Sequence, residues 1–215
     1  MADRRVLIIS YSFTQQTRAL VRRFVAGLES TGVIVVQERL EPIAPYEYPF
    51  SNDLQLGIAM AATLLQRRMP IRPVSERCRG DWDCIVLAGP TWSYNPSGPM
   101  LDFLDRFGAA VCGGQRVAPL ISCRAYWQMH HWVLKRLLRR CGASSVDPPV
   151  VFTHPVGEPW RSLGLLLKLR GKIGLKKYRW IRRSYPRYGH SETQRIEAEE
   201  QGRLLGQRLA AGQGQ

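Results

Sequence analysis

RVLIISYSFTQQTRALVRRFVAGL, residues 5–28, joins an apolar run to an amphipathic pattern through a polar turn. The run 5–10 predicts a strand, and the apolar spacing after it predicts a helix over 17–32. The turn 10–17 offers Ser and Thr hydroxyl groups beside the unpaired backbone N–H groups of the helix start. These groups and the helix dipole stabilise a dianion, so the turn is a candidate phosphate site. An ordinary N-cap rich in Ser and Thr is the alternative interpretation.

The alternation of strand and helix continues along the chain. The residue patterns predict further strands at 33–40, 85–88, 117–122 and 150–153, and helices at 54–68, 99–107, 127–141 and 192–209. Five strands that alternate with helices predict a doubly wound α/β domain, with a parallel sheet between two helical layers. In such sheets, ligands bind beyond the carboxyl ends of the strands.

The composition favours a single domain over residues 1–215. With 215 residues and 45% hydrophobic content, the chain can bury one sizeable core. The first apolar run is too short for a signal peptide or a membrane span, so we expect a cytoplasmic protein. The five cysteines show no CxxC motif and no close Cys/His spacing. They predict reduced thiols, with neither a disulfide framework nor a metal site.

Two further loops follow the predicted third and fourth strands. Loop 89–99 carries Trp92 and Tyr94, whose rings can stack on a flavin while turn N–H groups bond its polar edge. In loop 122–127, Arg124 can face the N1 and O2 atoms of such a ring, where reduction places negative charge. The simpler interpretations are rings that only pack on the domain and an exposed arginine without a specific contact.

The three loops together resemble those of the flavodoxin superfamily, and the resemblance covers most of residues 5–154. It implies a flavodoxin-like, three-layer fold whose five-stranded sheet has the order 2-1-3-4-5 and holds FMN non-covalently. Two positions differ from the usual pattern, because Gln15 stands where a glycine is usual and Ser10 where an aromatic residue is usual. The residues that the resemblance implies for FMN binding are Ser10, Ser12, Phe13, Thr14, Gln15, Gln16, Thr17, Pro90, Thr91, Trp92, Ser93, Tyr94, Asn95, Ser122, Cys123, Arg124, Tyr126 and Trp127.

Two longer motifs narrow the resemblance. TWSYNPSGPMLDFL (91–104) and SCRAYWQMHHWVLKRLLRRCGA (122–143) are similar to the flavodoxin-like family named dialkylresorcinol condensing enzymes. That family acts beside a ketosynthase-like partner in making aromatic lipids. The resemblance implies an FMN-dependent oxidoreductase that aromatises a cyclic, apolar small molecule by hydride transfer, rather than a condensing enzyme. The candidate catalytic residues are Arg124, Tyr126 and His130, and Tyr46 and Tyr48 are candidates for the roof of the site.

Three other functions stay open. An NAD(P)H-dependent quinone reductase, with NAD(P)H as its electron partner, is one of them, and a flavodoxin-type electron carrier is another. Such carriers are usually acidic so that they dock on basic reductases, and a basic chain disfavours that class. The third is a flavin-free scaffold for a ketosynthase-like enzyme, an interpretation that Gln15 supports. A homodimer is left open in each case.

The positive charge is concentrated in an insert at 155–190, between the fifth strand and the last helix. Ten Lys or Arg and no acidic residue lie in 160–187, and subtracting them from the net charge of +14 leaves +4 for the rest. Leucines between 163 and 169, followed by these cations, predict peripheral contact with an anionic membrane. Gly164, Gly171 and Gly174 weaken any helix in this segment. The alternative is a solvated basic loop folded over the active site. The basic residues match no nucleic-acid reader fold, so we do not expect nucleic acid as a partner.

Overall fold

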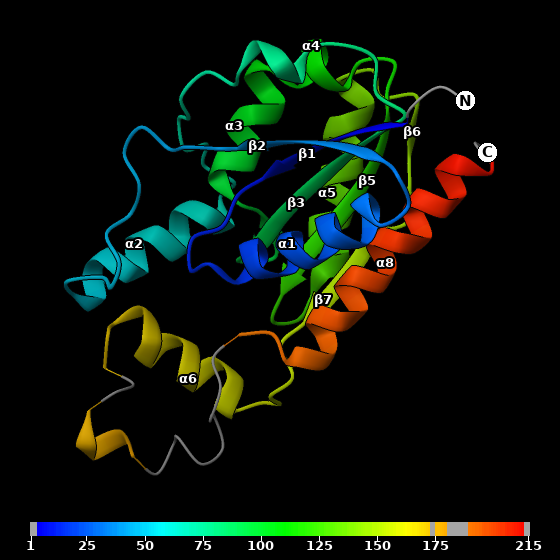
Figure 1. The fold of residues 1–215 in the computed structure, drawn as a ribbon. Coiled ribbons are helices and arrows are strands. Elements are labelled where there is room, and N and C mark those ends of the chain that lie inside the picture. The colour runs from blue at the N-terminus through cyan, green and yellow to red at the C-terminus, as the bar shows by residue number, and fades with distance from the viewer. Residues whose placement is uncertain (1–3, 173–174, 180–188, 213–215) are drawn as a thin grey trace.

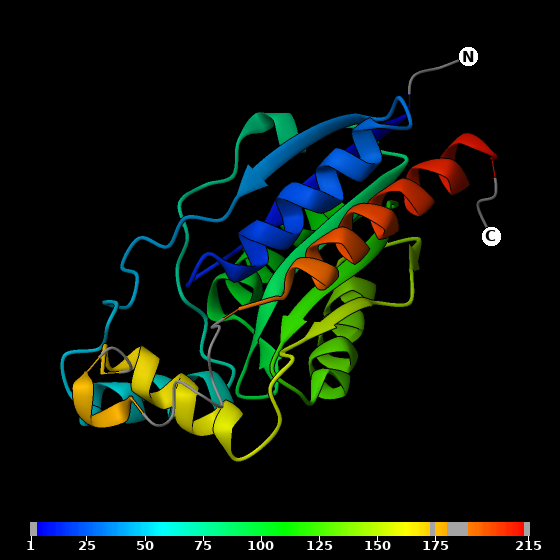
Figure 2. The ribbon, with the colours of Figure 1, turned by 60° about the horizontal axis from the view of Figure 1, so that its bottom comes forward.

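The computed structural model describes residues 4–172, 175–179 and 189–212, which form a sheet between two layers of helices (Figures 1 and 2). The parallel strands are, in spatial order, β2 (Ile34–Arg39), β1 (Arg5–Ser10), β3 (Cys84–Trp92), β5 (Arg116–Cys123) and β7 (Val150–Thr153). This arrangement confirms the predicted α/β class and the order 2-1-3-4-5 of the five predicted strands.

The sheet has seven strands rather than the predicted five. One extra strand, β6 (Ser145–Val146), pairs with the start of β5, whereas β7 pairs with the end of β5. The two strands therefore share one position in the sheet. Pro148 and Pro149 separate them, because proline lacks the N–H group that would continue the ladder. The other extra strand, β4 (Asn95–Pro96), forms a short hairpin with β3.

Both faces of the sheet are covered by helices. Helices α1 (Gln16–Glu29) and α8 (Glu192–Ala210) cover one face, and α3 (Gly98–Arg106), α4 (Gly108–Cys112) and α5 (Trp127–Arg140) cover the other (Figure 2). In β1, Val6 and Ile8 are buried against the first pair of helices. Leu7 and Ile9 are buried in the core on the opposite face. A strand buried on both faces needs a continuous apolar run, which is what residues 6–9 supply.

The last helix packs directly on α1 through glycine. A Cβ atom on Gly202 would lie 2.0 Å from the carbonyl oxygen of Phe24. A Cβ atom on Gly27 would lie 1.8 Å from the carbonyl oxygen of Glu199. Only glycine allows the two backbones to approach so closely. The C-terminal helix is thereby fixed as the second helix on its face of the sheet.

Two helices lie outside these layers, beyond the end of the sheet where the parallel strands finish (Figures 1 and 2). They are α2 (Asp53–Leu64) and α6 (Trp160–Leu169), and short 3-10 turns occur at η1 (Glu76–Cys78) and η2 (Lys176–Tyr178). The helix α6 belongs to the predicted insert. A helix forms there although glycines weaken it, and Gly164 is buried inside α6. Packing outweighs the propensity penalty of about 1 kcal/mol for one glycine. Gly174, Arg182, Arg183 and Arg187 lie outside the described residues.

Across the part of the chain that the structure describes, no helix combines the length and apolar character needed to cross a bilayer. The five cysteines are free thiols, and all except Cys141 are buried. Within the same described residues, no group of three or more His, Cys, Asp or Glu side chains is placed to hold a metal ion.

Candidate functional site

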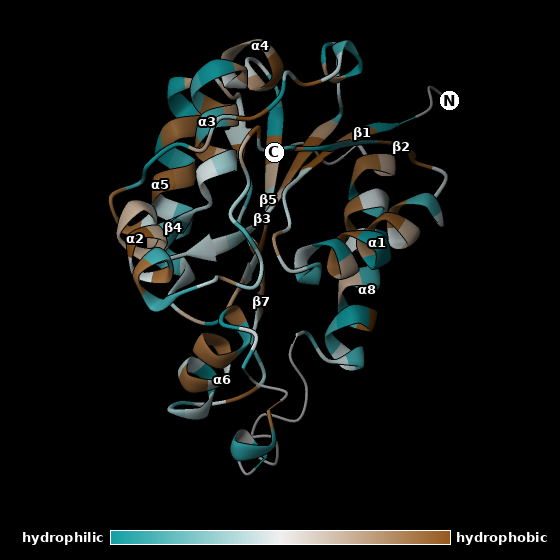
Figure 3. Ribbon diagram, turned by 90° about the vertical axis from the view of Figure 1, so that its left-hand side faces the viewer, coloured by the Kyte–Doolittle hydropathy of each residue, from teal (hydrophilic) through white to brown (hydrophobic). Residues whose placement is uncertain are grey.

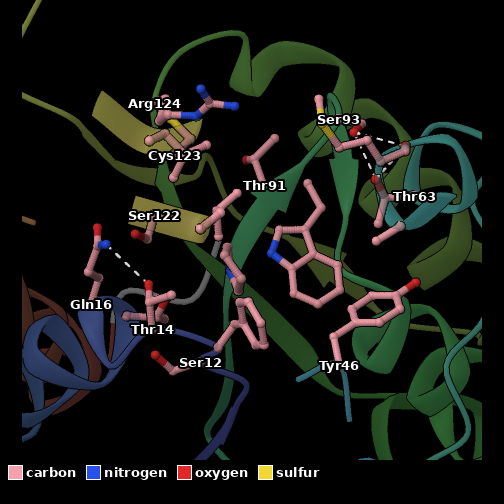
Figure 4. Close-up of a pocket in the computed structure, with 18 of the residues that line it drawn as sticks. Ser12, Thr14, Gln16, Tyr46, Thr63, Thr91, Ser93, Ser122, Cys123 and Arg124 are labelled. Carbon is pink, nitrogen blue, oxygen red and sulfur yellow. Dashed lines mark hydrogen bonds between the residues drawn. The ribbon is translucent and has the colours of Figure 1, made fainter. Parts of the chain in front are cut away.

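A pocket lies beyond the carboxyl ends of β1, β3, β5 and β7, where a doubly wound sheet is expected to bind its ligand (Figure 4). Its volume is about 150 Å³. The first, second and third predicted loops all contribute to it, and α2 and α6 close it from the other side. The lining residues are Ser12, Phe13, Thr14, Gln16, Thr17, Tyr46, Phe50, Leu56, Ala59, Met60, Thr63, Pro90, Thr91, Trp92, Ser93, Ser122, Cys123, Arg124, His154, Leu165 and Leu169.

The first loop brings hydroxyl groups to the start of α1. The Oγ atom of Ser12 accepts a hydrogen bond from the backbone N–H of Arg18 over 3.3 Å. The Oγ1 atom of Thr14 accepts one from Nε2 of Gln16 over 3.1 Å, and Thr17 is buried against the pocket. Figure 4 shows Ser12, Thr14 and Gln16 together on one side of the cavity. This edge of the pocket therefore combines hydroxyl donors with the positive end of a helix dipole.

Gln15 does not line the pocket. Its backbone is left-handed, with φ of 64°, which explains why glycine is usual at this position in flavodoxin-like loops. Its side chain is exposed, and its Oε1 atom accepts a hydrogen bond from Nη1 of Arg18 over 3.3 Å. The glutamine therefore strains the backbone without narrowing the cavity. Ser10 also lies outside the lining, at the end of β1.

The second loop contributes an aromatic wall. The ring of Trp92 lies 5.7 Å from that of Phe13, 6.0 Å from that of Tyr46 and 5.6 Å from that of Tyr11. In Figure 4 the Tyr46 ring and an indole ring stand on the side of the cavity opposite Gln16. Tyr46, one of the two predicted roof residues, thus lines the pocket, while the ring of the other, Tyr48, packs on Phe13 at 5.6 Å.

The remaining predicted aromatic residues of the second and third loops, Tyr94, Tyr126 and Trp127, do not line the pocket. Ser93 and Tyr94 form the two-residue hairpin turn between β3 and β4, with positive φ values of 41° and 71°. Tyr94 is 49% exposed, and its ring contacts that of Tyr126, itself 60% exposed, at 5.4 Å. Asn95 is buried, and its amide donates to the carbonyl oxygens of residues 63 and 64 at the end of α2. Trp127 contacts His131 instead of the cavity.

The third loop places Ser122, Cys123 and Arg124 on the lining. Ser122 shares a hydrogen bond of 2.8 Å with Nε2 of His190, at the approach to α8. Burial raises the pKa of the Cys123 thiol to about 11, so this thiol is protonated at neutral pH. The carbonyl oxygen of Arg124 accepts a hydrogen bond from Nη1 of Arg161 over 2.9 Å, which connects this loop to α6.

His130, a candidate catalytic residue, lies behind the pocket. It is buried, and its Nδ1 atom shares a hydrogen bond of 2.8 Å with Oγ1 of Thr91. Burial lowers its pKa to about 3, and the charge of His131 acts in the same direction, so the imidazole is neutral in the fold. Through this bond His130 orients a side chain of the lining rather than contacting the cavity itself.

Part of the basic insert covers the pocket. Leu165 and Leu169 of α6 line the cavity, and the carbonyl oxygen of Leu169 accepts a hydrogen bond from the backbone N–H of Phe50 over 2.8 Å. Nε of Arg170 bonds Oδ1 of Asp53 over 2.5 Å, and Nη1 of the same arginine bonds the carbonyl oxygen of Phe50. The segment therefore closes the cavity as a lid held by backbone and arginine contacts.

The lid side of the pocket is cationic. Burial lowers the pKa of His154, which lines the cavity beside the end of β7, to about 4. The charges that act in the same direction are those of His190, Arg161, Arg124 and Lys168. Burial also lowers the pKa of Lys168, to about 8. Since no carboxylate is among the described residues of the lining, the pocket suits an anionic or neutral ligand.

Several lining residues fall outside the three predicted loops. Those from the loop before α2 and from α2 itself are Phe50, Leu56, Ala59, Met60 and Thr63, and those from the insert are Leu165 and Leu169. His154 had a usable signal, because it follows the fifth predicted strand directly and so lies at the ligand-binding edge of the sheet.

Comparison with known proteins gives structural matches only. No family model and no curated protein matches the chain. A flavodoxin from the domain Archaea matches over 96% of this chain and 99% of its own, with 13% identity and a TM-score of 0.51. A flavoprotein from Lactobacillus acidophilus NCFM, solved in complex with FMN, matches over 70% of this chain and 93% of its own, with 15% identity and a TM-score of 0.54.

The fold is flavodoxin-like. A flavone reductase matches over 98% of this chain and 65% of its own, with 13% identity and a TM-score of 0.53. At such identities, the likeness establishes the shared architecture and leaves the chemistry to be argued from the pocket.

Proposed function

We propose that this chain is an FMN-dependent oxidoreductase that transfers hydride from a cyclic, apolar substrate. The observation that carries the proposal is the composition of one pocket. It joins a hydroxyl-rich helix start to an aromatic wall and a cationic side, at the edge of the sheet where flavodoxin-like folds expose their loops. The lining has no carboxylate among its described residues.

The residues present fit FMN. Ser12, Thr14 and Thr17 would hold its phosphate, because their hydroxyl groups and the N-terminus of α1 suit a dianion. Trp92 would lie beside the ring, since its indole already forms part of the aromatic wall. Arg124 would oppose the negative charge that reduction places on the ring. FMN, when bound, supplies the hydride acceptor, and an external oxidant such as a quinone or NAD(P)⁺ restores it.

The lid supports a catalytic role over that of an electron carrier. Leu165 and Leu169 bring apolar side chains to the cavity opposite the sheet, and Phe50 and Leu56 continue that apolar surface. A partly enclosed pocket with a mainly apolar lining favours an apolar substrate. A carrier exchanges electrons with other proteins and has no need of such an enclosure.

The finer proposal is oxidative aromatisation beside a ketosynthase-like enzyme, and it rests on the motifs at 91–104 and 122–143. Loss of two hydrogen atoms from a cyclic diketone gives an aromatic diol: one leaves as hydride to the acceptor, and the other leaves as a proton to water. Because a C–H group next to a carbonyl is acidic, the reaction needs a hydride acceptor more than a strong base. The pocket lining fits a reaction without a strong base. The thiol of Cys123 is protonated at neutral pH, and His130 lies behind the lining.

The test is a titration of the purified full-length protein with FMN, followed by anaerobic addition of an alkyl-substituted cyclic diketone. We expect tight binding of FMN and bleaching of its visible absorbance by the diketone. Bleaching by NAD(P)H alone, with reoxidation by quinones, would instead identify a quinone reductase. If FMN binds but neither reagent bleaches it, the protein is an electron carrier. If FMN does not bind, the protein is a flavin-free scaffold.

A further inference from the structure

Helix α2 is apolar, yet most of it faces outward. Only Leu56 and Ala59 of its residues are buried. The side chains of Leu54, Ile58 and Leu65 are 73%, 57% and 79% exposed. We call these three residues, two in α2 and Leu65 directly after its end, the outer face of α2. A contiguous apolar surface of this kind marks an interaction site more often than a free surface.

Cations follow the lid, the other element beyond the carboxyl ends of the strands. Figure 1 shows α6 below α2, and the Phe50–Leu169 and Asp53–Arg170 hydrogen bonds connect the start of α2 to the end of α6. Lys172, Lys176 and Arg179 follow α6, and Lys176 and Arg179 are exposed. No acidic residue occurs in 159–179. Figure 3 shows brown, hydrophobic stretches on both α2 and α6.

We propose that this end of the molecule docks on an anionic lipid surface, with the outer face of α2 in the headgroup region and the cations after α6 at the phosphates. An exposed apolar helical face together with a segment of unopposed cations is a combination that favours peripheral membrane binding. Each cation near an anionic leaflet strengthens binding about fivefold. The docking does not depend on what the pocket binds.

Charge decides between lipid and a second copy of this chain. A symmetric dimer through α2 would bring two copies of the same basic segment together. Since Lys172, Lys176 and Arg179 have no acidic neighbours in that segment, their repulsion would oppose the contact. An anionic bilayer offers the complementary charge and also covers the leucines.

The experiment is sedimentation of the full-length protein with vesicles of phosphatidylcholine, with or without phosphatidylglycerol. The apolar variant is Leu54→Gln with Ile58→Gln and Leu65→Gln, and the cation variant is Lys172→Gln with Lys176→Gln and Arg179→Gln. A matched control for charge is Arg139→Gln with Arg140→Gln, two exposed cations at the other end of α5. Ile34→Gln, at the start of β2, is the control for an exposed apolar residue.

We expect the wild-type chain to bind only the anionic vesicles and to lose that binding steeply as salt rises, because screening shortens the reach of exposed charges. The cation variant should bind about a hundredfold more weakly, and the apolar variant should lose binding at every salt concentration. Both controls should bind as the wild type does. Absence of binding at low salt, or an equal loss in the Arg139/Arg140 control, would overturn the proposal. So would a concentration-dependent dimer that the apolar variant abolishes. Unchanged circular dichroism in the variants shows that they remain folded.

Discussion

The backbone N–H of Phe50 donates to the carbonyl oxygen of Leu169 over 2.8 Å, joining the loop before α2 to the last turn of the lid. Phe50 and Leu169 both line the pocket, so this one bond connects two walls that are remote in sequence. Arg170 strengthens the junction, because its guanidinium bonds both Asp53 and the carbonyl oxygen of Phe50. Closure of the cavity therefore depends on a small set of contacts.

The first prediction is that Arg170→Ala loosens the lid. Loss of a charge-assisted hydrogen bond costs about 1.5–3 kcal/mol, which is a tenfold to hundredfold change in the opening equilibrium. Hydrogen exchange at the Phe50 amide should accelerate by that factor. Asp53→Asn is the matched control, because Asp53 is 79% exposed and surface ion pairs contribute about 0–1 kcal/mol. Equal exchange in the two variants would show that the carbonyl contact does not hold the lid.

Sequence reasoning could place the strand ends but not the lid. Ser12 and Trp92 follow predicted strands, and Ser122 is the last residue of one. Because parallel strands present their carboxyl ends at one edge, the proximity of the three residues was predictable. The contact between Phe50 and Leu169 joins segments that no period or motif relates. Only tertiary packing brings α6 over the cavity.

The two tyrosines that leave the site illustrate a second limit. Tyr94 and Tyr126 have positive φ values of 71° and 59°, in a hairpin turn and at a helix N-cap. Glycine or asparagine would have signalled such conformations, whereas tyrosine does not. The left-handed backbone turns both rings outward, where they contact each other.

The second prediction concerns the phosphate loop. The double variant Thr14→Val with Thr17→Val should weaken FMN binding by about 3–6 kcal/mol, because each lost hydroxyl donor to a charged acceptor contributes about 1.5–3 kcal/mol. Fluorescence titration with FMN measures the change. Gln15→Gly is the matched control in the same loop, and it should leave FMN affinity unchanged because its side chain bonds Arg18 outside the cavity. If the double variant keeps the wild-type affinity for FMN, the phosphate does not bind at this loop.

The third prediction is an acid-sensitive fold. Burial lowers the pKa of His130 to about 3, from an ordinary value near 6.5. Between about pH 6.5 and pH 3, the unfolded chain therefore binds a proton at this residue, whereas the folded chain does not. The free energy of unfolding should fall as the pH falls from 6.5 toward 3. The loss from this one residue at about pH 5 is about 2 kcal/mol.

Urea unfolding at about pH 7 and about pH 5 measures this loss. His130→Gln should be less stable at neutral pH, since Thr91 loses a partner, but its stability should change less between the two conditions. An unchanged pH dependence in that variant would mean that other groups govern acid unfolding.

The last prediction tests the glycine contact between α1 and α8. In Gly202→Ala, the new methyl group would meet the carbonyl oxygen of Phe24 at 2.0 Å, and the backbones must separate to accept it. Overpacking of this kind costs about 1–3 kcal/mol, and part of the core under α8 would be exposed in addition. Gly57→Ala is the matched control, because a Cβ at Gly57 in α2 meets nothing within 4 Å. That replacement should stabilise the helix by about 0.5–1 kcal/mol. The midpoint of urea unfolding should therefore fall in Gly202→Ala and rise in Gly57→Ala, although both variants add the same methyl group. Equal effects would mean that helix propensity, and not the close approach of two backbones, sets the role of Gly202.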